Sequence, residues 1–551
     1  QLEDVVEYKS LPSGLHHVKE DLIYYNHKGY AGISAFASRP AEEAQRNAHF
    51  VAVGVLVPLD YGRLGRSWLY AEQLQDLAEQ LVHNTEQTEP LEEFWNAHCL
   101  DEQEPSQNET SSLAGPPGVQ TEDSQPGPSL QREGRNRALS DVPALEAGSA
   151  LSPTHPALSL TVLLDTFGPL AFPLYRAALL RKRILFVGSA PVRRSCDFAA
   201  SAEAIHGSPE HVEQLARIDP LFSVGVHDIP LLKELATQQS LPSQPGSEAT
   251  NNRGRRGWLA CTTDDIIATK TSLYDVVVNL PDRLAGQSTK RLWPQIQTSS
   301  GMQIKATQRD LRRYRTLQTV LHHLRQPQAP ADPATPNDTS ESPETEDTDS
   351  SPLLCAPTAG PEASDEPAPL EDENSLTEPA SWLSAAYTSF MWWASAGEKD
   401  AFLADEVALD EALLADLPLL EEAARTHDRP RPRPTGNSSG GPAASNRRGS
   451  LAENEDSDAA QQIALVLIAY FHRLTALIFE TAKDAVDSAG EGAAAAGREV
   501  VPIDGEDVRG MGLDVWSEAD KGFVKEFVGL YFGSEARVTG ASVECCGLRI
   551  C

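Results

Sequence analysis

One apolar stretch, residues 158–187, constrains the fold of this chain more than any other. Its first half carries leucines and a phenylalanine at helical spacing, and a second helical run follows the pair Gly168-Pro169. Pro173 suits the first turn of that second helix, because an N–H there would have no intrahelical partner. Three cations at 181–183 then precede a short apolar strand. This order predicts an α/β layer whose side chains pack in a core rather than carry chemistry.

The same stretch resembles the central segment of DENN-domain proteins, in particular the LCHN-like subfamily and its fungal relatives. The resemblance lies in the pattern F-G-P-L-x-F-P-L-Y-R-A-A-L-L-R-K-R-I-L-F at residues 167–186. Residues 11–36 and 53–68 resemble the upstream lobe of that family, and residues 258–281 resemble the end of its central lobe. The resemblance implies a tripartite DENN-like α/β architecture. It comprises a longin-type α/β lobe, a central α/β lobe with a mostly parallel sheet and a helical C-terminal lobe, with disordered inserts.

Three polar tracts divide the chain: 103–154 is rich in Pro, Gly, Ser and Glu, 326–380 is rich in Pro, Ser, Thr and acidic residues, and 425–457 carries Arg-Pro repeats. Such compositions bury too little apolar surface to offset the entropy of ordering, so all three tracts are predicted to be disordered. The expected segments are an upstream longin-like lobe at 1–102, a linker at 103–154, the central lobe at 155–325, an acidic linker at 326–380, a helical part of the downstream lobe at 381–424, a linker at 425–457 and the C-terminal helical part of the downstream lobe at 458–551.

In the upstream lobe, residues 50–57 are apolar on both faces, which predicts a buried strand. Residues 67–83 have helical spacing, and the apolar side of that helix carries Trp68, Leu74, Leu77, Ala78 and Leu81. DENN-like proteins normally begin with a β-hairpin ahead of the part that matches here. We therefore expect the natural chain to begin upstream of Gln1.

In the central lobe, strands alternate with helices, which implies a mostly parallel sheet. We expect a helix that includes Cys196, a cap at Asp264 for a short helix that ends at Lys270, and a closing helix at 308–324. The remaining strands are expected at 218–226, 258–261 and 274–278.

The downstream lobe is predicted to be helical. Residues 381–397 form an aromatic helix with Trp382, Ala386, Phe390 and Trp393 on one face, for core or partner contact rather than for membrane insertion. Further helices are expected at 404–420, 461–486 and 518–532, followed by a strand-like terminus at 543–551. The spacing of Cys545, Cys546 and Cys551 lacks a zinc pattern, so these are expected to be buried thiols.

The formal net charge of −34 excludes a general nucleic-acid binder, because neutralising phosphates needs a basic surface. Local basic clusters occur at 181–183, 193–194, 253–256 and 309–315. We interpret them as solvated surfaces, and docking to an acidic partner or to anionic lipid remains the alternative.

Seven cysteines, an odd number, favour a reducing compartment with free thiols. No uninterrupted apolar window reaches the length of a membrane span, so a cytoplasmic protein, peripheral on endomembranes at most, is expected.

The sequence contains no phosphate loop, zincin helix, dinucleotide fingerprint or kinase signature set, so we predict no catalytic, cofactor-binding or metal-binding residue. Arg447 and Arg448 precede Ser450 as a basophilic kinase requires, which makes Ser450 a phosphorylation candidate.

The resemblance implies a guanine-nucleotide exchange factor or regulator for a Rab GTPase in vesicle trafficking. The alternative is a non-catalytic DENN-like adaptor or scaffold that regulates small GTPases or membranes. A hydrolase built on Ser438 is rejected, because neither a strand nor a helix flanks that serine.

Overall fold

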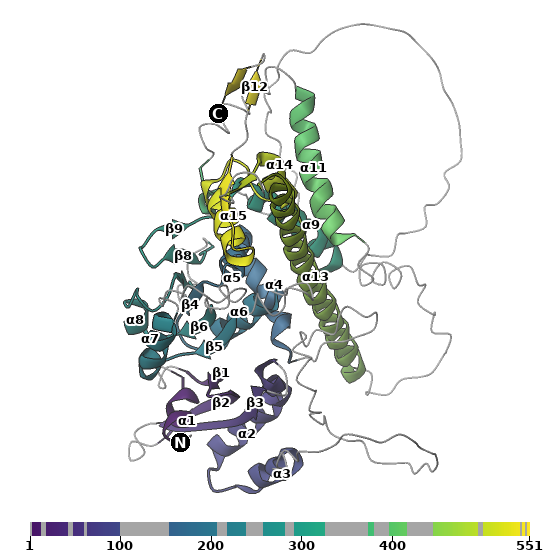
Figure 1. The fold of residues 1–551 in the computed structure, drawn as a ribbon. Helices are drawn as coiled ribbons and strands as arrows, with labels where there is room; N and C mark the ends of the chain where they lie inside the picture. Colours follow the sequence, from purple (N-terminus) through teal and green to yellow (C-terminus); the bar gives the residue numbers. More distant parts are fainter. Residues whose placement is uncertain are drawn as a thin grey trace, which may run out of the picture.

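We describe the protein from a computed structural model of the chain. The description covers residues 3–12, 18–41, 48–59, 63–99, 154–205, 218–238, 257–281, 291–325, 373–379, 396–415, 445–493, 500–539, 543–545 and 548–550. These residues form an α/β structure in which one large mixed sheet lies among helices (Figure 1).

The large sheet has nine strands in the order β3-β2-β1-β5-β6-β4-β7-β8-β9. The strands are β1 (Glu20–His27), β2 (Tyr30–Pro40), β3 (Ala48–Pro58), β4 (Arg183–Val187), β5 (Asp219–Ser223), β6 (Trp258–Thr262), β7 (Val276–Asn279), β8 (Gln295–Thr298) and β9 (Gln303–Ile304). The pairs β5/β6, β6/β4 and β4/β7 are parallel, and the other pairs are antiparallel. The predicted mostly parallel sheet is therefore present in the middle of a larger, mixed one.

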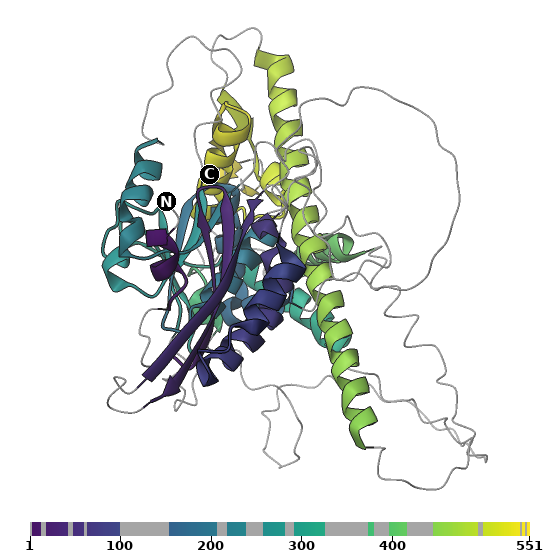
Figure 2. The same ribbon diagram turned by 90° about the horizontal axis from the view of Figure 1, so that it is seen from below.

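Strands β1, β2 and β3 form an antiparallel ribbon at one end of the sheet, and Figure 2 shows these strands along their length. Lys28 and Gly29 both have positive φ, as the two-residue turn between β1 and β2 requires. The strand predicted at 50–57 exists, but the prediction that it is buried on both faces was wrong. β3 lies at the edge of the sheet, where β2 is its only strand neighbour among the described residues and α2 (Ala71–His83) packs against it. Most residues of β3 are therefore only partly buried.

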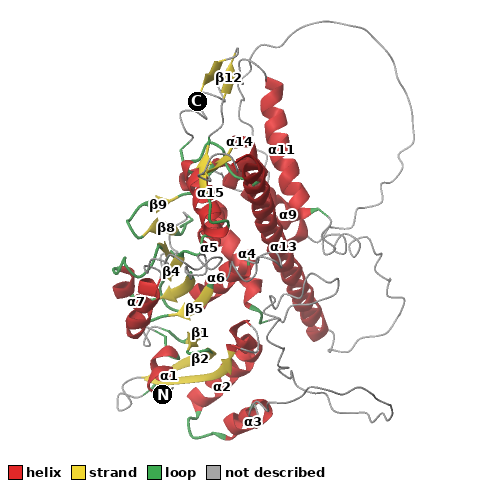
Figure 3. Cartoon of the chain, in the orientation of Figure 1, coloured by secondary structure: helices red, strands yellow, loops and turns green. Residues whose placement is uncertain are grey.

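The described helices account for most of the remaining residues (Figure 3). They are α1 (Glu3–Lys9), α2, α3 (Glu89–His98), α4 (Leu160–Phe167), α5 (Ala171–Leu179), α6 (Arg193–Ala204), α7 (Ile229–Gln238), α8 (Asp265–Ala268), α9 (Gln308–Arg325), α11 (Ala396–Leu414), α13 (Ser445–Ala493), α14 (Gly505–Gly510) and α15 (Glu518–Tyr531). The helices predicted at 308–324 and 518–532 are confirmed. Asp264 precedes α8 as predicted, but its side chain makes no capping hydrogen bond.

The stretch 158–187 folds as predicted, into α4, α5 and β4. Gly168 separates the two helices with φ +56°, and a Cβ there would lie 2.7 Å from the ring of Trp293. All nine residues of α5 are buried. Arg181, also at positive φ, ends the helix and turns the chain into the sheet.

Alternate residues of β4 face two separate apolar cores. Ile184 and Phe186 belong to the large core, which continues through α4, α5, α6 and α13. Leu185 points the other way, into a smaller core under α7 and α8. This alternation follows from the twofold period of a strand, and it explains why the strand is apolar throughout.

The C-terminal helices differ from the predicted boundaries. Residues 445–457 were assigned to a disordered linker, but α13 begins at Ser445 and runs for 49 residues. Good helix formers at 451–453 and the absence of proline between Pro442 and Pro502 favour this extension. α11 begins at Ala396, earlier than the predicted 404. The aromatic residues of the helix predicted at 381–397 lie outside the described residues.

The predicted acidic linker 326–380 also contains structure. Residues Glu373–Leu376 form a 3₁₀ turn, and Thr377 forms a parallel bridge with Ala306. Ala306 N–H donates to Leu376 O at 3.0 Å, and Glu378 N–H donates to Ala306 O at 2.8 Å. These backbone bonds and the burial of Thr377 offset the cost of ordering the segment.

Four short strands near the C-terminus complete the described fold. β10 (Val500–Ile503) pairs in parallel with β11 (Glu535–Val538). β12 (Val543–Cys545) pairs with β13 (Leu548–Ile550), which confirms the strand-like terminus. The side chains of the cysteines at 545, 546 and 551 lie outside the description, so their state remains a prediction.

Two described segments are long and apolar enough to cross a membrane, Pro156–Leu179 and Ala460–Ala489. The fold buries 67% of the apolar window in the first segment and 72% of that in the second. Core packing therefore accounts for most of their apolar surface.

Candidate functional site

The ribbon β1–β3 meets the parallel strands at a junction that contains buried polar groups. Only one residue pair, Tyr25 and Phe222, joins β1 to β5. Asp21, 4% exposed, accepts hydrogen bonds from the backbone N–H of Val192 at 2.8 Å and of Arg193 at 3.0 Å. These N–H groups start α6, so a carboxylate of the ribbon binds the positive end of a helix that belongs to the other half.

The pKa values at this junction reflect burial. Burial raises the pKa of Asp21, although the hydrogen bonds from Val192 and Arg193 oppose the rise. Burial also raises the pKa of Asp197, one turn further along α6, against the attraction of Arg193. Several perturbed groups in one place are typical of functional sites, and also of buried structural networks.

Two cysteines lie directly behind the junction. Cys196 on α6 and Cys261 on β6 are both fully buried, free thiols, with their sulfur atoms 3.3 Å apart. Burial raises the pKa of Cys196 well above its usual value, and Cys261 adds to the rise. A thiol that stays protonated is a poor nucleophile, so the pair packs in the core rather than catalyses a reaction.

A second contact between the halves comes from α1. Lys9, 6% exposed, pairs with Asp228 at 2.8 Å, and Tyr8 stacks on His227 with ring centroids 4.3 Å apart. Asn26 of β1 also donates to Pro220 O of β5. Polar contacts in addition to the one strand pair thus fix the placement of the ribbon relative to the parallel strands.

A buried charge network links α5, α9 and α15. Arg176 of α5 donates two hydrogen bonds to Asp310 of α9, at 2.8 and 2.6 Å, and its Nε lies 3.3 Å from Asp520 of α15. Burial raises the pKa of Asp520 to about 7 despite the attraction of Arg176. Glu378 accepts from the N-cap residue Ser517 at 2.9 Å, and burial raises its pKa too. The network joins three helices and the 373–379 segment.

The basic cluster at 309–315 was predicted to be a solvated surface, and that was wrong for two of its arginines. Arg309 and Arg313 are 2% and 1% exposed. Both pair with Asp410 of α11, and Arg312 pairs with Glu406 of the same helix. The carboxylate partners lie about a hundred residues away in sequence, so no local pattern shows them.

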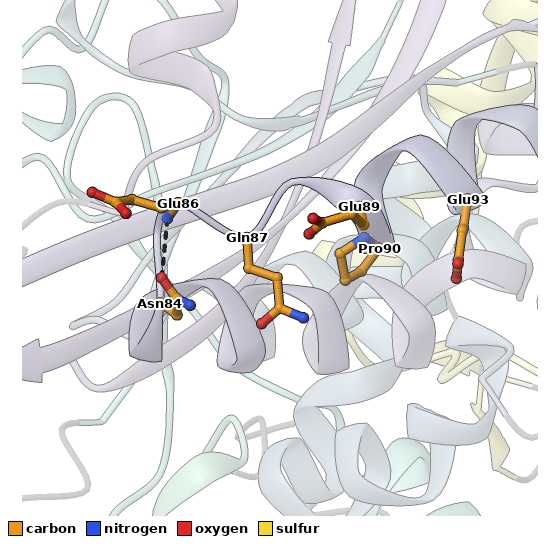
Figure 4. A pocket seen from close by; sticks show the side chains of 6 residues that line it. All are labelled: Asn84, Glu86, Gln87, Glu89, Pro90 and Glu93. Carbon is orange, nitrogen blue, oxygen red and sulfur yellow. Dashed lines mark hydrogen bonds between the residues drawn. The ribbon is translucent and has the colours of Figure 1, made fainter.

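A shallow hollow of about 540 Å³ lies between α2 and α3 (Figure 4). Its lining residues are Asn84, Glu86, Gln87, Glu89, Pro90 and Glu93. Small-molecule sites are mostly apolar with a few convergent polar groups, and this polar, acidic lining lacks that character. Within the described ranges, no group of three or more His, Cys, Asp or Glu is arranged to hold a metal ion.

Ser450, the predicted phosphorylation site, lies in the sixth position of α13. Its modification remains a prediction. Buried polar contacts join separate segments of the fold, and its outer surfaces are available to a partner. Among the described residues, a nucleophile, a base and an anion-binding group do not lie together as a catalytic site requires.

Comparison with known proteins identifies two regions of similarity. A model of the DENN domain-containing protein 11 family matches residues 1–290. A model described as Domain of unknown function (DUF4484) matches residues 377–496 and 490–551. The first match covers the ribbon, the junction and the parallel strands of the large sheet, and the second covers the C-terminal helices.

Similar individual proteins come from vertebrates and yeast. The DENN domain-containing protein 11 of Xenopus laevis is 31% identical over 280 residues, which is 50% of this chain and 53% of the relative. Its counterpart in Danio rerio is 29% identical over 280 residues, 50% and 47% of the two chains. An uncharacterized protein of Schizosaccharomyces pombe is 25% identical over 325 residues, 57% and 65% of the two chains. The chain spans about half the length of the vertebrate relatives that it matches.

Proposed function

Because the chain belongs to the DENN domain-containing protein 11 family, we propose that it is a guanine-nucleotide exchange factor or regulator for a Rab-family GTPase in vesicle trafficking. The observation that carries the proposal is the family match over residues 1–290. DENN-domain proteins generally act on Rab GTPases and are not conventional enzymes. The proposal includes a Rab-family partner, exchange activity on it and a peripheral location on endomembranes. It also includes the division of the chain into an upstream, a central and a downstream lobe.

Exchange requires surfaces rather than a catalytic residue. A factor that binds nucleotide-free GTPase more tightly than the nucleotide-bound form weakens nucleotide binding by the same ratio. It does so by holding the switch region where its Mg²⁺ and phosphate contacts are disturbed. We propose that the ribbon and the parallel-sheet half form the two sides of the GTPase site, with the junction at Asp21 setting their spacing.

The test is release of fluorescent GDP from a panel of purified Rab GTPases. The wild-type chain should accelerate release from one or a few of them and should retain these GTPases preferentially in the nucleotide-free state. Asp21→Ala, which loosens the junction, should slow exchange more than Asp405→Asn, a control on the exposed side of α11. A folded protein that accelerates no Rab would refute exchange. Stable binding that ignores the nucleotide state would support the adaptor alternative instead.

A further inference from the structure

Arginine side chains of α9 hold helix α11 through two of its carboxylates. Arg309 of α9 makes a two-bond contact with Asp410, at 2.7 and 2.8 Å, and Arg313 adds a third bond at 3.0 Å. Arg312 makes another two-bond contact with Glu406, at 2.7 and 3.0 Å. Two carboxylates four residues apart on one helix face are therefore each met by the fork of a guanidinium.

A fourth arginine recognises the end of the same helix. Arg473 of α13 donates to the backbone oxygens of Leu413, at 3.1 Å, and of Ala415. A cation at that position pairs with carbonyl groups that have no partner within the helix. We call Arg309, Arg312, Arg313 and Arg473 the arginine cradle. It recognises an acidic face and a helix C-terminus together.

One arginine of the cradle, Arg313, is also held by a contact outside α11. Arg313 also donates to Gly512 O at 2.8 Å, and Gly512, at φ +71°, approaches so closely that a Cβ would lie 2.4 Å from Arg313 Nη2. Asp310, between Arg309 and Arg312 in sequence, is fixed to Arg176. The guanidinium of Arg313 is therefore positioned in part by the segment that follows α14, and α9 between Arg309 and Arg312 is fixed to α5 through Asp310.

Helix α11 itself has little apolar anchorage. Among its residues with described side chains, only Glu406, Asp410, Leu413 and Leu414 are buried, and Val407 is 43% exposed. Half of the buried set is charged, and buried ion pairs contribute little net stability because desolvation offsets their attraction. The contact is therefore strongly selective for an acidic helix but only moderately favourable for α11.

We propose that the arginine cradle is a binding site for acidic helices, that α11 is its removable internal occupant, and that an acidic helix of a partner protein takes its place. The matching ligand has two carboxylates four residues apart, as at Glu406 and Asp410, and two leucines near its C-terminal end. Charge complementarity carries the assignment, because the cradle presents four cations to a helix that supplies two anions and a carbonyl end. The proposal is independent of exchange activity.

The test uses the full chain with recognition sequences for a specific protease inserted after Ser395, directly before α11, and after Arg425. Cleavage after folding leaves α11 bound without covalent attachment to the rest of the protein. A fluorescent peptide of residues 396–415 is then added, and its anisotropy is followed as the salt concentration rises to about 1 M, where charge interactions beyond about 3 Å are screened. We expect saturable binding of the peptide, release of the cleaved α11, and weaker binding as salt rises.

Three peptide variants make the test specific. Asp410→Ala removes the anion that Arg309 and Arg313 share, and it should weaken binding at least about a hundredfold. Val407→Ala, at an exposed position, should bind like the parent peptide. A scrambled peptide of the same composition should not compete.

Two results would overturn the proposal. One is that cleaved α11 cannot be exchanged, or that its release unfolds the protein by circular dichroism, because α11 would then be an ordinary core helix. The other is that the Asp410→Ala or scrambled peptide binds as well as the parent, because the cradle would then lack the recognition described here.

Discussion

Replacing Asp520 by asparagine should remove a large pH dependence of stability. Asp520 is fully buried, and burial raises its pKa from an ordinary 3.8 to about 7. A carboxyl whose pKa is raised in the folded state contributes stability that is complete below 3.8 and is lost as the pH rises to about 7. Each pH unit in that interval lowers the free energy of unfolding by about 1.4 kcal/mol, so the whole interval accounts for about 4 kcal/mol.

Asparagine resembles the protonated carboxyl in shape and charge, and its oxygen can still accept the hydrogen bond from Asp514 N–H. The variant should therefore be close to wild type below about pH 4, more stable than wild type by about 2 kcal/mol at pH 5, and more stable by about 4 kcal/mol near pH 8. Urea unfolding of both proteins at pH 5, 6, 7 and 8 measures this difference, with Asp405→Asn as the exposed control. Parallel curves for wild type and Asp520→Asn would show that the buried carboxyl does not titrate as the structure implies.

Three further substitutions test the packing. Phe172→Ala, at a fully buried position of α5, should lower the free energy of unfolding by about 3–5 kcal/mol, measured by denaturant unfolding. Asp21→Ala should cost about 2 kcal/mol through the lost contacts to the start of α6, and an unchanged midpoint of thermal unfolding would contradict that role. Gly512→Ala should cost at least about 1 kcal/mol more than Gly301→Ala, because both have positive φ but only the former meets a neighbouring side chain. Equal losses for the two glycines would refute the close approach.

The sequence predicted helices and strands well where the spacing of apolar residues and the positions of helix-ending residues indicated the same boundaries. In the stretch 158–187, Gly168, Pro173 and the cations at 181–183 mark the ends of helices that the leucines define. The burial of β3 was misjudged, because a continuous apolar run does not show whether a strand lies at an edge. The hairpin of β8 and β9 was missed, because its short strands are rich in glutamine and carry little apolar alternation.

The junction and the charge networks could not be predicted from local patterns. Asp21 binds N–H groups 171 and 172 residues away, and Arg176 pairs with Asp310 across 134 residues. A cation or carboxylate in a single sequence has the same pattern whether it faces water or a distant partner. Only the folded arrangement distinguishes Arg313, which is buried and paired, from an arginine on a solvated surface.

The single pair between Tyr25 and Phe222 has a consequence for the order in which the chain folds. The ribbon strands follow one another in sequence and pair with their neighbours, so they close short loops and form early. The parallel strands need crossover connections, and β4 pairs with β6 across more than seventy residues, which makes their assembly slower. Because the strand pairing between the two parts is limited to this one pair, neither part needs the other to form its own strand pairs. We expect the ribbon to exist as a preformed unit that docks late, when the start of α6 becomes available to Asp21.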